Sequence, residues 1–112
     1  MIHYMKLKDE PFCAIKSGKK VVEMRLFDEK RTLLKVNDFI KFVNIESEEK
    51  LDSKVQELKK FSNFEELYNF YDKTELGYMD YQNASYTDML KYYSNSDIEK
   101  YGVIAIKIKV VD

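Results

Sequence analysis

The spacing of hydrophobic and polar residues changes along the chain at about residue 62. Before this point the spacing tends toward a period of two, which is typical of β-strands. Four segments are predicted to be strands there: residues 2–7, 19–26, 38–45 and 50–61. At the other end of the chain, Ile104, Ile106 and Ile108 recur at every second position. They predict a closing strand over residues 103–111.

From residue 62 the hydrophobic spacing becomes that of an α-helix. Phe64, Leu67, Tyr68 and Tyr71 fall at i, i+3, i+4 and i+7 and form one helical stripe. Ser62-x-x-Glu65 precedes this stripe as a capping box. Shorter helical segments are predicted from Pro11 to Ser17, over residues 28–34, and after Ser85 and Ser96, the last ending at Gly102.

The order of these elements is strand, helix, several strands, a helical insertion and a closing strand. Because regular crossover helices do not separate the strands, a doubly wound parallel sheet is not expected. The pattern predicts an α+β fold, a small mixed or antiparallel β-barrel flanked by short helices, in which closure pairs the two terminal strands. A length of 112 residues fits a single domain over residues 1–112.

Composition excludes several classes of protein. Apolar residues make up 45% and charged residues 35% of the chain, a globular rather than disordered balance. No apolar run approaches the length of a membrane span, so we expect no membrane partner. Cys13 is the single cysteine and His3 the single histidine, so we expect neither a disulfide nor a metal or other cofactor. A cytoplasmic location is expected, and a monomer is favoured while oligomeric state stays open.

Charge is distributed unevenly along the chain. The net charge is −1, but residues 1–60 hold 14 Lys and Arg against 11 Asp and Glu, whereas residues 61–112 hold 5 against 9. A polyanion would therefore meet the N-terminal half. Its binding would depend on a few local contacts and on salt.

The second predicted strand carries opposite charges close together. Alternation places Glu23 and Arg25 on the face opposite Val22 and Met24. On a solvated face these charges would form an ion pair that contributes less than about 1 kcal/mol. Alternatively, Arg25 and the nearby Lys20 offer hydrogen-bond donors and Glu23 an acceptor, a combination that can hold an anionic or amide-bearing ligand. The pattern alone leaves both interpretations open.

These charges form the motif Gly18-x-Lys20-x-x-Glu23-x-Arg25, which resembles the G-x-K-x-x-E-x-R motif of ASCH domains in the PUA-like superfamily. The resemblance covers nearly the whole chain. Asn37 departs from it, standing where family members usually have glycine. The other similar segments are Leu7-x-x-Glu10-Pro11-Phe12-x-x-Ile15, Asp28-x-Lys30-Arg31, Leu34-Lys35-Val36-Asn37-Asp38, Tyr92-Tyr93-Ser94 and Tyr101-Gly102-Val103-x-x-Ile106.

The resemblance implies a five- or six-stranded barrel with a cleft between barrel and helices. It implies that RNA, a nucleotide or a modified nucleoside binds in this cleft at Lys20, Glu23 and Arg25. An alternative is a small hydrolase, because some members resemble ribonucleases and a bacterial group hydrolyses N4-acetylcytidine with a Lys, a Thr and a Glu. Lys20 matches that lysine, whereas Glu23 falls where that group has threonine, so Glu23 would act as the base. A protein-interaction module is a third interpretation.

Tyrosines are concentrated in the C-terminal half, where eight of nine lie between residues 68 and 101. A tyrosine ring can stack on a base and its hydroxyl can form a hydrogen bond. Tyr68 and Tyr71 belong to the predicted helical stripe and are expected to pack in the core. Tyr78, Tyr81 and Tyr86 follow in or after the loop at Gly77 and are the predicted cleft-wall residues.

Overall fold

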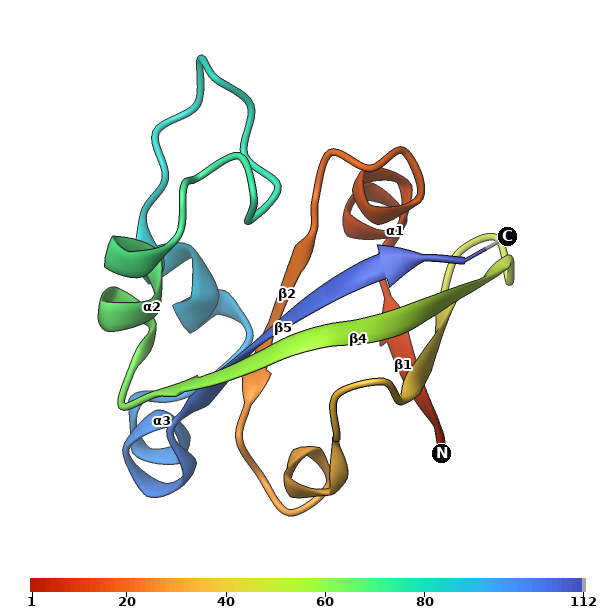
Figure 1. Cartoon of the computed structure of the whole chain (residues 1–112). Coiled ribbons are helices and arrows are strands. Elements are labelled where there is room, and N and C mark those ends of the chain that lie inside the picture. The colour runs from red at the N-terminus through yellow and green to blue at the C-terminus, as the bar shows by residue number, and fades with distance from the viewer. Residues whose placement is uncertain (112) are drawn as a thin grey trace.

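A curved β-sheet with short helices packed against it makes up the structure, a computed structural model that describes residues 1–111 (Figure 1). In chain order the elements are β1 (Ile2–Leu7), α1 (Asp9–Lys16), β2 (Val22–Leu26), the 3-10 helix η1 (Arg31–Leu33), β3 (Phe39–Asn44), β4 (Lys50–Phe61), α2 (Phe64–Phe70), the 3-10 helix η2 (Tyr86–Lys91), α3 (Asn95–Tyr101) and β5 (Val103–Val110).

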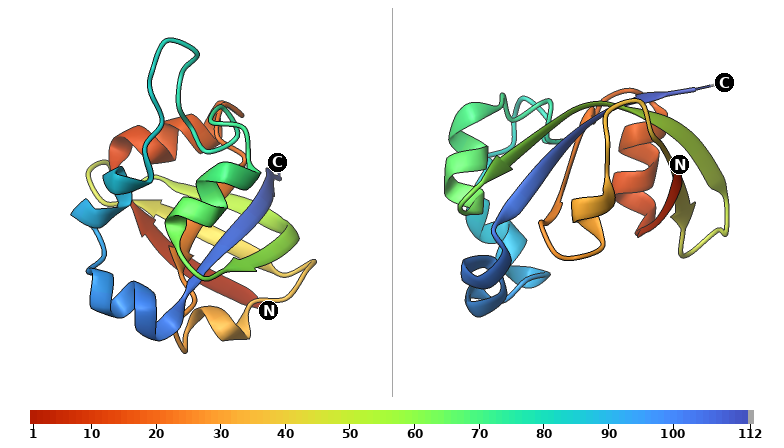
Figure 2. Two further views of the ribbon diagram at one scale, coloured as in Figure 1. Left: turned by 90° about the vertical axis from the view of Figure 1, so that its left-hand side faces the viewer. Right: turned by 60° about the horizontal axis from the view of Figure 1, so that its bottom comes forward.

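Across the described residues the strands form one five-stranded sheet in the order β1-β3-β4-β5-β2. The β1–β3 pair is parallel and the other three pairs are antiparallel. The right view of Figure 2 shows β4 and β5 arching over α1, so that the sheet curls into a half-barrel. This confirms the predicted α+β fold with a mixed sheet.

The predicted closure of the barrel through the terminal strands is wrong. β1 pairs with β3, and β5 lies between β4 and β2. β1 and β2 therefore form the two edges of the sheet, and an open seam remains between them. β5 already pairs with β4 on one side and with β2 on the other, so neither side of it is left for β1.

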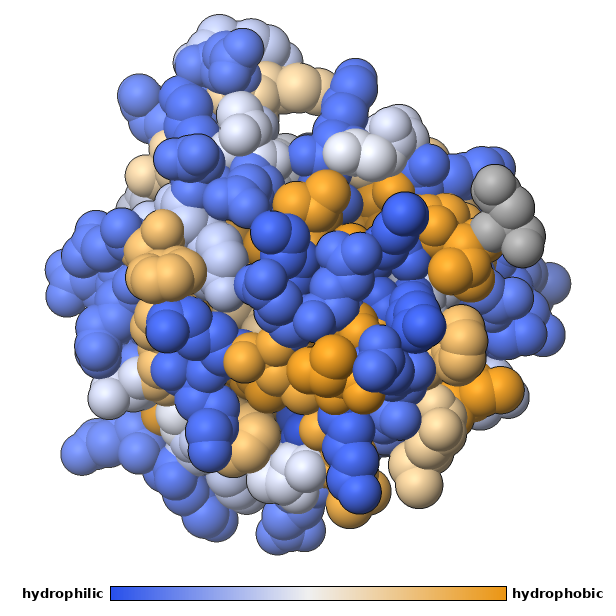
Figure 3. All heavy atoms as spheres, viewed as in Figure 1, coloured by the Kyte–Doolittle hydropathy of each residue, from blue (hydrophilic) through white to orange (hydrophobic). Residues whose placement is uncertain are grey.

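Two hydrophobic clusters lie on opposite sides of the sheet. The first packs α1 into the curve of the half-barrel, with Phe12 and Ile15 against residues such as Phe42 and Ile106. The second covers β2 and the start of β5 with the C-terminal helices. Its members include Val22, Met24, Phe64, Leu67, Ile98 and Val103. By contrast, Figure 3 shows hydrophilic side chains over much of the face that β4 and β5 present to the viewer.

Several element boundaries differ from the predicted ones. The second strand begins at Val22 rather than at residue 19, because the N–H groups of Lys20 and Val21 donate to α1 and to a loop, although the Val21 carbonyl accepts from the Ile108 N–H of β5 at 2.9 Å. Asn63, not Ser62, caps α2 by accepting a hydrogen bond from the Glu66 N–H. Ser94, not Ser96, caps α3 in the same way. Ser85 caps η2 as predicted, and η2 is a 3-10 helix.

Two turn predictions are confirmed by backbone geometry. Asn37 has φ of 78° and Gly18 has φ of 82°, the left-handed region that glycine adopts freely and asparagine tolerates.

Between residues 1 and 111, no helix combines the length and the apolar composition needed to cross a bilayer. In the same residues, no group of three or more His, Cys, Asp or Glu side chains is placed to hold a metal ion.

Candidate functional site

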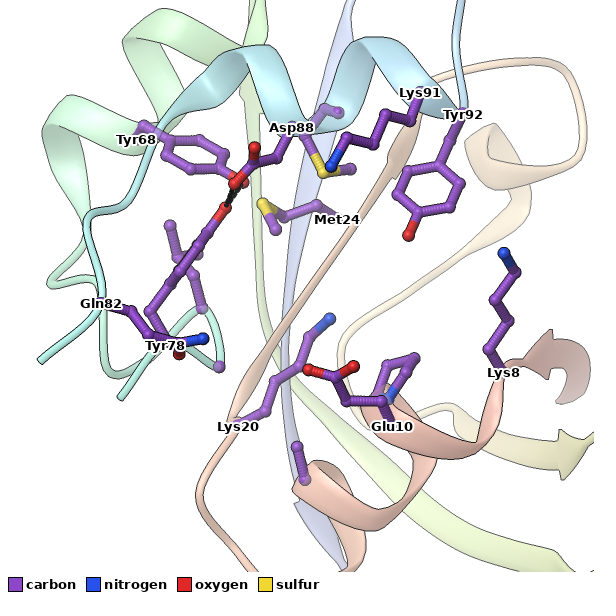
Figure 4. A pocket seen from close by; sticks show the side chains of 15 residues that line it. Lys8, Glu10, Lys20, Met24, Tyr68, Tyr78, Gln82, Asp88, Lys91 and Tyr92 are labelled. Atoms are coloured by element: carbon purple, nitrogen blue, oxygen red, sulfur yellow. Dashed lines mark hydrogen bonds between the residues drawn. The ribbon is translucent and has the colours of Figure 1, made fainter. Parts of the chain in front are cut away.

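A groove runs between α1 and β2 on one side and η2 with the segment before it on the other (Figure 4). It consists of two adjoining cavities with volumes of about 410 and 360 Å³. Ligand sites in proteins typically measure about 300–1,000 Å³. The two cavities share six lining residues: Lys8, Pro11, Lys20, Met24, Met89 and Tyr92.

Lys20 lies where the two cavities meet, and its backbone is fixed from two directions. Its N–H donates to the Ala14 carbonyl of α1 at 3.0 Å. The next two N–H groups, of Val21 and Val22, both donate to the Glu75 carbonyl at 3.0 Å. A Cβ placed on Gly77 would lie 3.1 Å from Lys20 Cδ, a contact tight enough that a larger residue would push the lysine stem aside. The ammonium group therefore points into the groove (Figure 4).

Glu23 holds Lys20 and Arg25 together. Its Oε1 accepts from the Met24 N–H at 3.0 Å and lies 3.0 Å from Lys20 Nζ. Its Oε2 accepts from Arg25 Nε at 3.1 Å and from Arg25 Nη2 at 2.9 Å. A carboxylate has about four lone-pair positions, so protein donors occupy all of them. The carboxylate is 5% exposed and offers no free acceptor to a ligand.

The charges of this cluster shift the pKa values of Glu23 and Arg25. Burial raises the pKa of Glu23, but the neighbouring Lys20 and Arg25 lower it by more than this, so that the pKa is about 2. Burial lowers the pKa of Arg25, and the Glu23 carboxylate more than offsets this, so that the pKa lies above its usual value. Glu23 and Arg25 are therefore ionised at neutral pH, and the cluster pairs one carboxylate with two basic side chains.

The unpaired hydrogen-bonding groups of the cluster are donors. Arg25 Nη2 also donates to the Lys6 carbonyl at 2.9 Å, which links β2 to β1 across the open seam. Arg25 Nη1 and the remaining N–H groups of Lys20 have no protein acceptor among residues 1–111. Both side chains line the groove. The cluster can thus bind an anion or a carbonyl oxygen.

Of the three predicted cleft-wall tyrosines, the structure places only Tyr78 in the groove. Its hydroxyl lies 2.7 Å from Asp88 Oδ2 and 2.8 Å from the Tyr68 hydroxyl. The structure does not place Tyr81 and Tyr86 in the groove, since they are 85% and 38% exposed and line neither of its two cavities. The physical reason is that the chain after Tyr78 projects outward as a loop before it returns at η2 (Figure 1).

Sequence reasoning missed other aromatic and apolar residues of the groove. Tyr92 is 60% exposed, and Lys8 Nζ lies 5.6 Å from its ring centre. Tyr93 stacks on Phe64 at 5.8 Å, and burial raises the pKa of its hydroxyl. The adjacent pair Tyr92-Tyr93 was a signal, because it belongs to the segments that resemble the family. Their approach to Lys20 depends on folding across some 70 residues.

A family model of the ASCH domain matches residues 5–112. The chain belongs to the ASCH domain family. This confirms the resemblance carried by the Gly18-x-Lys20-x-x-Glu23-x-Arg25 motif, and with it the PUA-like character of the half-barrel. No curated protein matches the chain.

Solved structures support the assignment of this ASCH domain. The crystal structure of hypothetical protein PH0355 is 31% identical, with a TM-score of 0.84, and the match covers 99% of this chain and all of that one. Protein PF0455 from Pyrococcus furiosus is 28% identical, with a TM-score of 0.76 and coverage of 100% and 99%. ASCH from Zymomonas mobilis, 16% identical with a TM-score of 0.70, shares the fold over 96% of this chain and 66% of its own.

The groove of this ASCH domain combines three kinds of surface. Lys20 and Arg25 provide hydrogen-bond donors, Tyr92 provides an exposed ring, and Met24 and Met89 provide apolar contacts. Bases stack on such rings, and phosphate and carbonyl oxygens accept from such donors. The arrangement suits a ligand with a flat ring and an oxygen-rich group.

Proposed function

We propose that this ASCH domain binds RNA, a nucleotide or a modified nucleoside in the groove. The observation that carries the proposal is the fully occupied carboxylate of Glu23, which holds Lys20 and Arg25 with their remaining donors free beside Tyr92. Donors fixed in advance lose little entropy when a ligand binds. Phosphate or base carbonyl oxygens would accept from Lys20 and Arg25 while the base packs on Tyr92.

The charge distribution supports this proposal. The basic residues of the groove are Lys6, Lys8, Lys20, Arg25 and Lys91, against the acidic Glu10, Glu23 and Asp88. One of these acids, Glu23, is already fully paired. An anionic ligand therefore meets a local excess of positive charge although the whole chain carries −1. The cytoplasmic location expected from the sequence is compatible with such a ligand.

The geometry favours binding over the hydrolase alternative. A general base needs a free lone pair and a pKa near the working pH. Glu23 has all four acceptor positions occupied and a pKa of about 2, so it is a poor base. Lys20 keeps donors for an oxyanion, but stabilising an oxyanion also requires a nucleophile, and Glu23 does not supply one.

The test is a titration of short RNAs and ribonucleoside monophosphates at low salt. Lys20→Gln removes the ammonium group from the groove, and Lys19→Gln is the matched control because Lys19 is exposed and does not line the groove. We expect Lys20→Gln to weaken binding about tenfold or more, the effect of losing a charged hydrogen bond, and Lys19→Gln to have little effect. Equal affinities of the two variants, or no binding by the wild type, would contradict the proposal.

A further inference from the structure

Asp88 presents a carboxylate on the wall of the groove that faces α1 (Figure 4). Its Oδ2 lies 2.7 Å from the Tyr78 hydroxyl. None of the ion pairs among residues 1–111 involves Asp88, and no hydrogen bond within those residues occupies its Oδ1. One carboxylate oxygen is therefore fixed by the protein and the other is free for a ligand.

The direction of the hydrogen bonds at Asp88 follows from proton counting. The Tyr78 hydroxyl has one proton and two acceptors in reach, the Asp88 carboxylate at 2.7 Å and the Ser85 carbonyl at 3.4 Å, and the shorter bond to Asp88 takes it. The Tyr68 hydroxyl, 2.8 Å away, must then donate to Tyr78. Burial, together with these two neighbours, raises the pKa of Tyr78 far above its usual value, so the proton stays in place. Asp88 is held as an oriented acceptor.

Gln82 provides a donor on the same wall, on the other side of Tyr78 (Figure 4). Its Oε1 accepts from the Met79 N–H at 2.7 Å, which fixes the orientation of the amide. Its Nε2 has no acceptor among the described residues and the side chain lines the groove. The wall thus presents one free acceptor and one free donor. Hydroxyl groups both donate and accept, so they satisfy such a wall.

The two ends of the groove differ in the charge of the group that they can bind. A phosphate next to Asp88 would be repelled, whereas Lys20 and Arg25 attract it. Acidic side chains bind ribose hydroxyls in dinucleotide-binding folds. We propose that Asp88, positioned by Tyr78 and assisted by Gln82, is a subsite for ribose hydroxyl groups, so that the groove selects ribonucleotides over 2′-deoxyribonucleotides. This inference rests on the proposed function.

The first arm of the test changes the ligand and leaves the protein unaltered. Wild-type protein is titrated with CMP, dCMP and 2′-O-methyl-CMP, followed by NMR chemical shifts. A hydrogen bond to a charged group is lost with dCMP, so we expect it to bind about tenfold more weakly than CMP. The 2′-O-methyl group can accept but not donate, so 2′-O-methyl-CMP should bind like dCMP.

The second arm changes the subsite. In Asp88→Asn the amide oxygen can still accept from Tyr78, while an NH₂ donor replaces the free acceptor. Since removal of a negative charge strengthens binding of any anion, the readout is the ratio of CMP to dCMP affinity, which should fall to about one. Asp80→Asn is the matched control, because Asp80 is exposed and outside the groove, and it should keep the ratio.

The outcomes separate this inference from the function on which it rests. Equal affinities of wild-type protein for CMP and dCMP would overturn the ribose subsite and leave groove binding intact. A ratio that Asp88→Asn does not change would also overturn it. Absence of binding by every nucleotide would overturn the subsite together with the proposed function. A tenfold preference that disappears only in Asp88→Asn supports it.

Discussion

Replacing Glu23 with glutamine should strongly destabilise the fold. Glutamine has nearly the shape of glutamate but no charge, and its NH₂ group cannot accept from Lys20 or Arg25. The side chains of Lys20 and Arg25 are 10% and 13% exposed. Both cations would therefore lose their counter-ion in a poorly hydrated environment, and at least one donor would face another donor.

The pKa of Glu23 gives the size of this effect. A shift from 4.5 in the unfolded chain to about 2 in the folded protein corresponds to about 3 kcal/mol at neutral pH. Breaking a buried ion pair by removing one partner typically costs about 3–5 kcal/mol. The two arguments agree on at least 3 kcal/mol, a large part of the roughly 5–15 kcal/mol that stabilises a typical domain.

The sign of the pH dependence distinguishes this electrostatic effect from a simple packing defect. Because folding lowers the pKa of Glu23, its contribution is fully present above pH 4.5 and is lost as the pH falls toward 2. In Glu23→Gln this contribution is absent at every pH. The difference in unfolding free energy between wild type and variant should therefore shrink by about 2 kcal/mol between pH 7 and pH 3.

Urea unfolding of both proteins at the two pH values measures this difference. The other carboxylates titrate in both proteins, so their contributions to the difference in unfolding free energy cancel to first order. Glu65→Gln is a control, because Glu65 is exposed and forms no ion pair among the described residues. A Glu23→Gln variant within about 1 kcal/mol of wild type at pH 7, or an equal difference at both pH values, would refute the reasoning.

Two backbone predictions follow from residues with positive φ. Gly77→Ala should cost about 1–3 kcal/mol and also weaken nucleotide binding, because φ is 103° and the new Cβ would meet Lys20 Cδ at 3.1 Å. In Gly18→Ala the φ is 82° and the new Cβ would have nothing within 4 Å, so this variant should be less stable in thermal melts but keep its affinity. Equal losses of affinity in the Gly77 and Gly18 variants would contradict this account. Asn37→Ala should lower the free energy of unfolding by about 1 kcal/mol, since asparagine tolerates φ of 78° better than alanine. Asn37→Gly should change it by less than about 0.5 kcal/mol, because glycine adopts this φ freely. Equal melting temperatures for the two Asn37 variants would exclude this explanation.

The regular elements could be predicted from the sequence because each depends on local periodicity. The exact helix starts could not, because Ser62 and Asn63, and likewise Ser94 and Ser96, are competing caps of similar chemistry. The choice between them depends on which side chain reaches the N–H of the third helical residue. Strand order could not be predicted from local periodicity either, because β1 could pair with β5 or with β3 without any change in its own alternation of residues.

The residues of the motif could be predicted, but not their environment. Alternation assigned Glu23 to a polar face and left open whether solvent or a ligand site lies on that side. In the structure both faces of β2 are covered, and Glu23 is 3% exposed. Nor could the positions of Tyr81 and Tyr86 outside the groove be predicted, since the direction of a loop is not encoded in the spacing of its aromatic residues.

Arg25 connects the groove to the open seam of the half-barrel. β1 and β2 are edge strands with no ladder between them, so the Arg25 side chain supplies a hydrogen bond across the seam, to the Lys6 carbonyl at 2.9 Å. Glu23 fixes the same guanidinium from the other side. The same atoms of the motif therefore link the two edge strands and orient hydrogen-bond donors in the groove. Burial beside two cations explains why an ion pair that would contribute less than about 1 kcal/mol on a solvated strand is expected to contribute about 3 kcal/mol here.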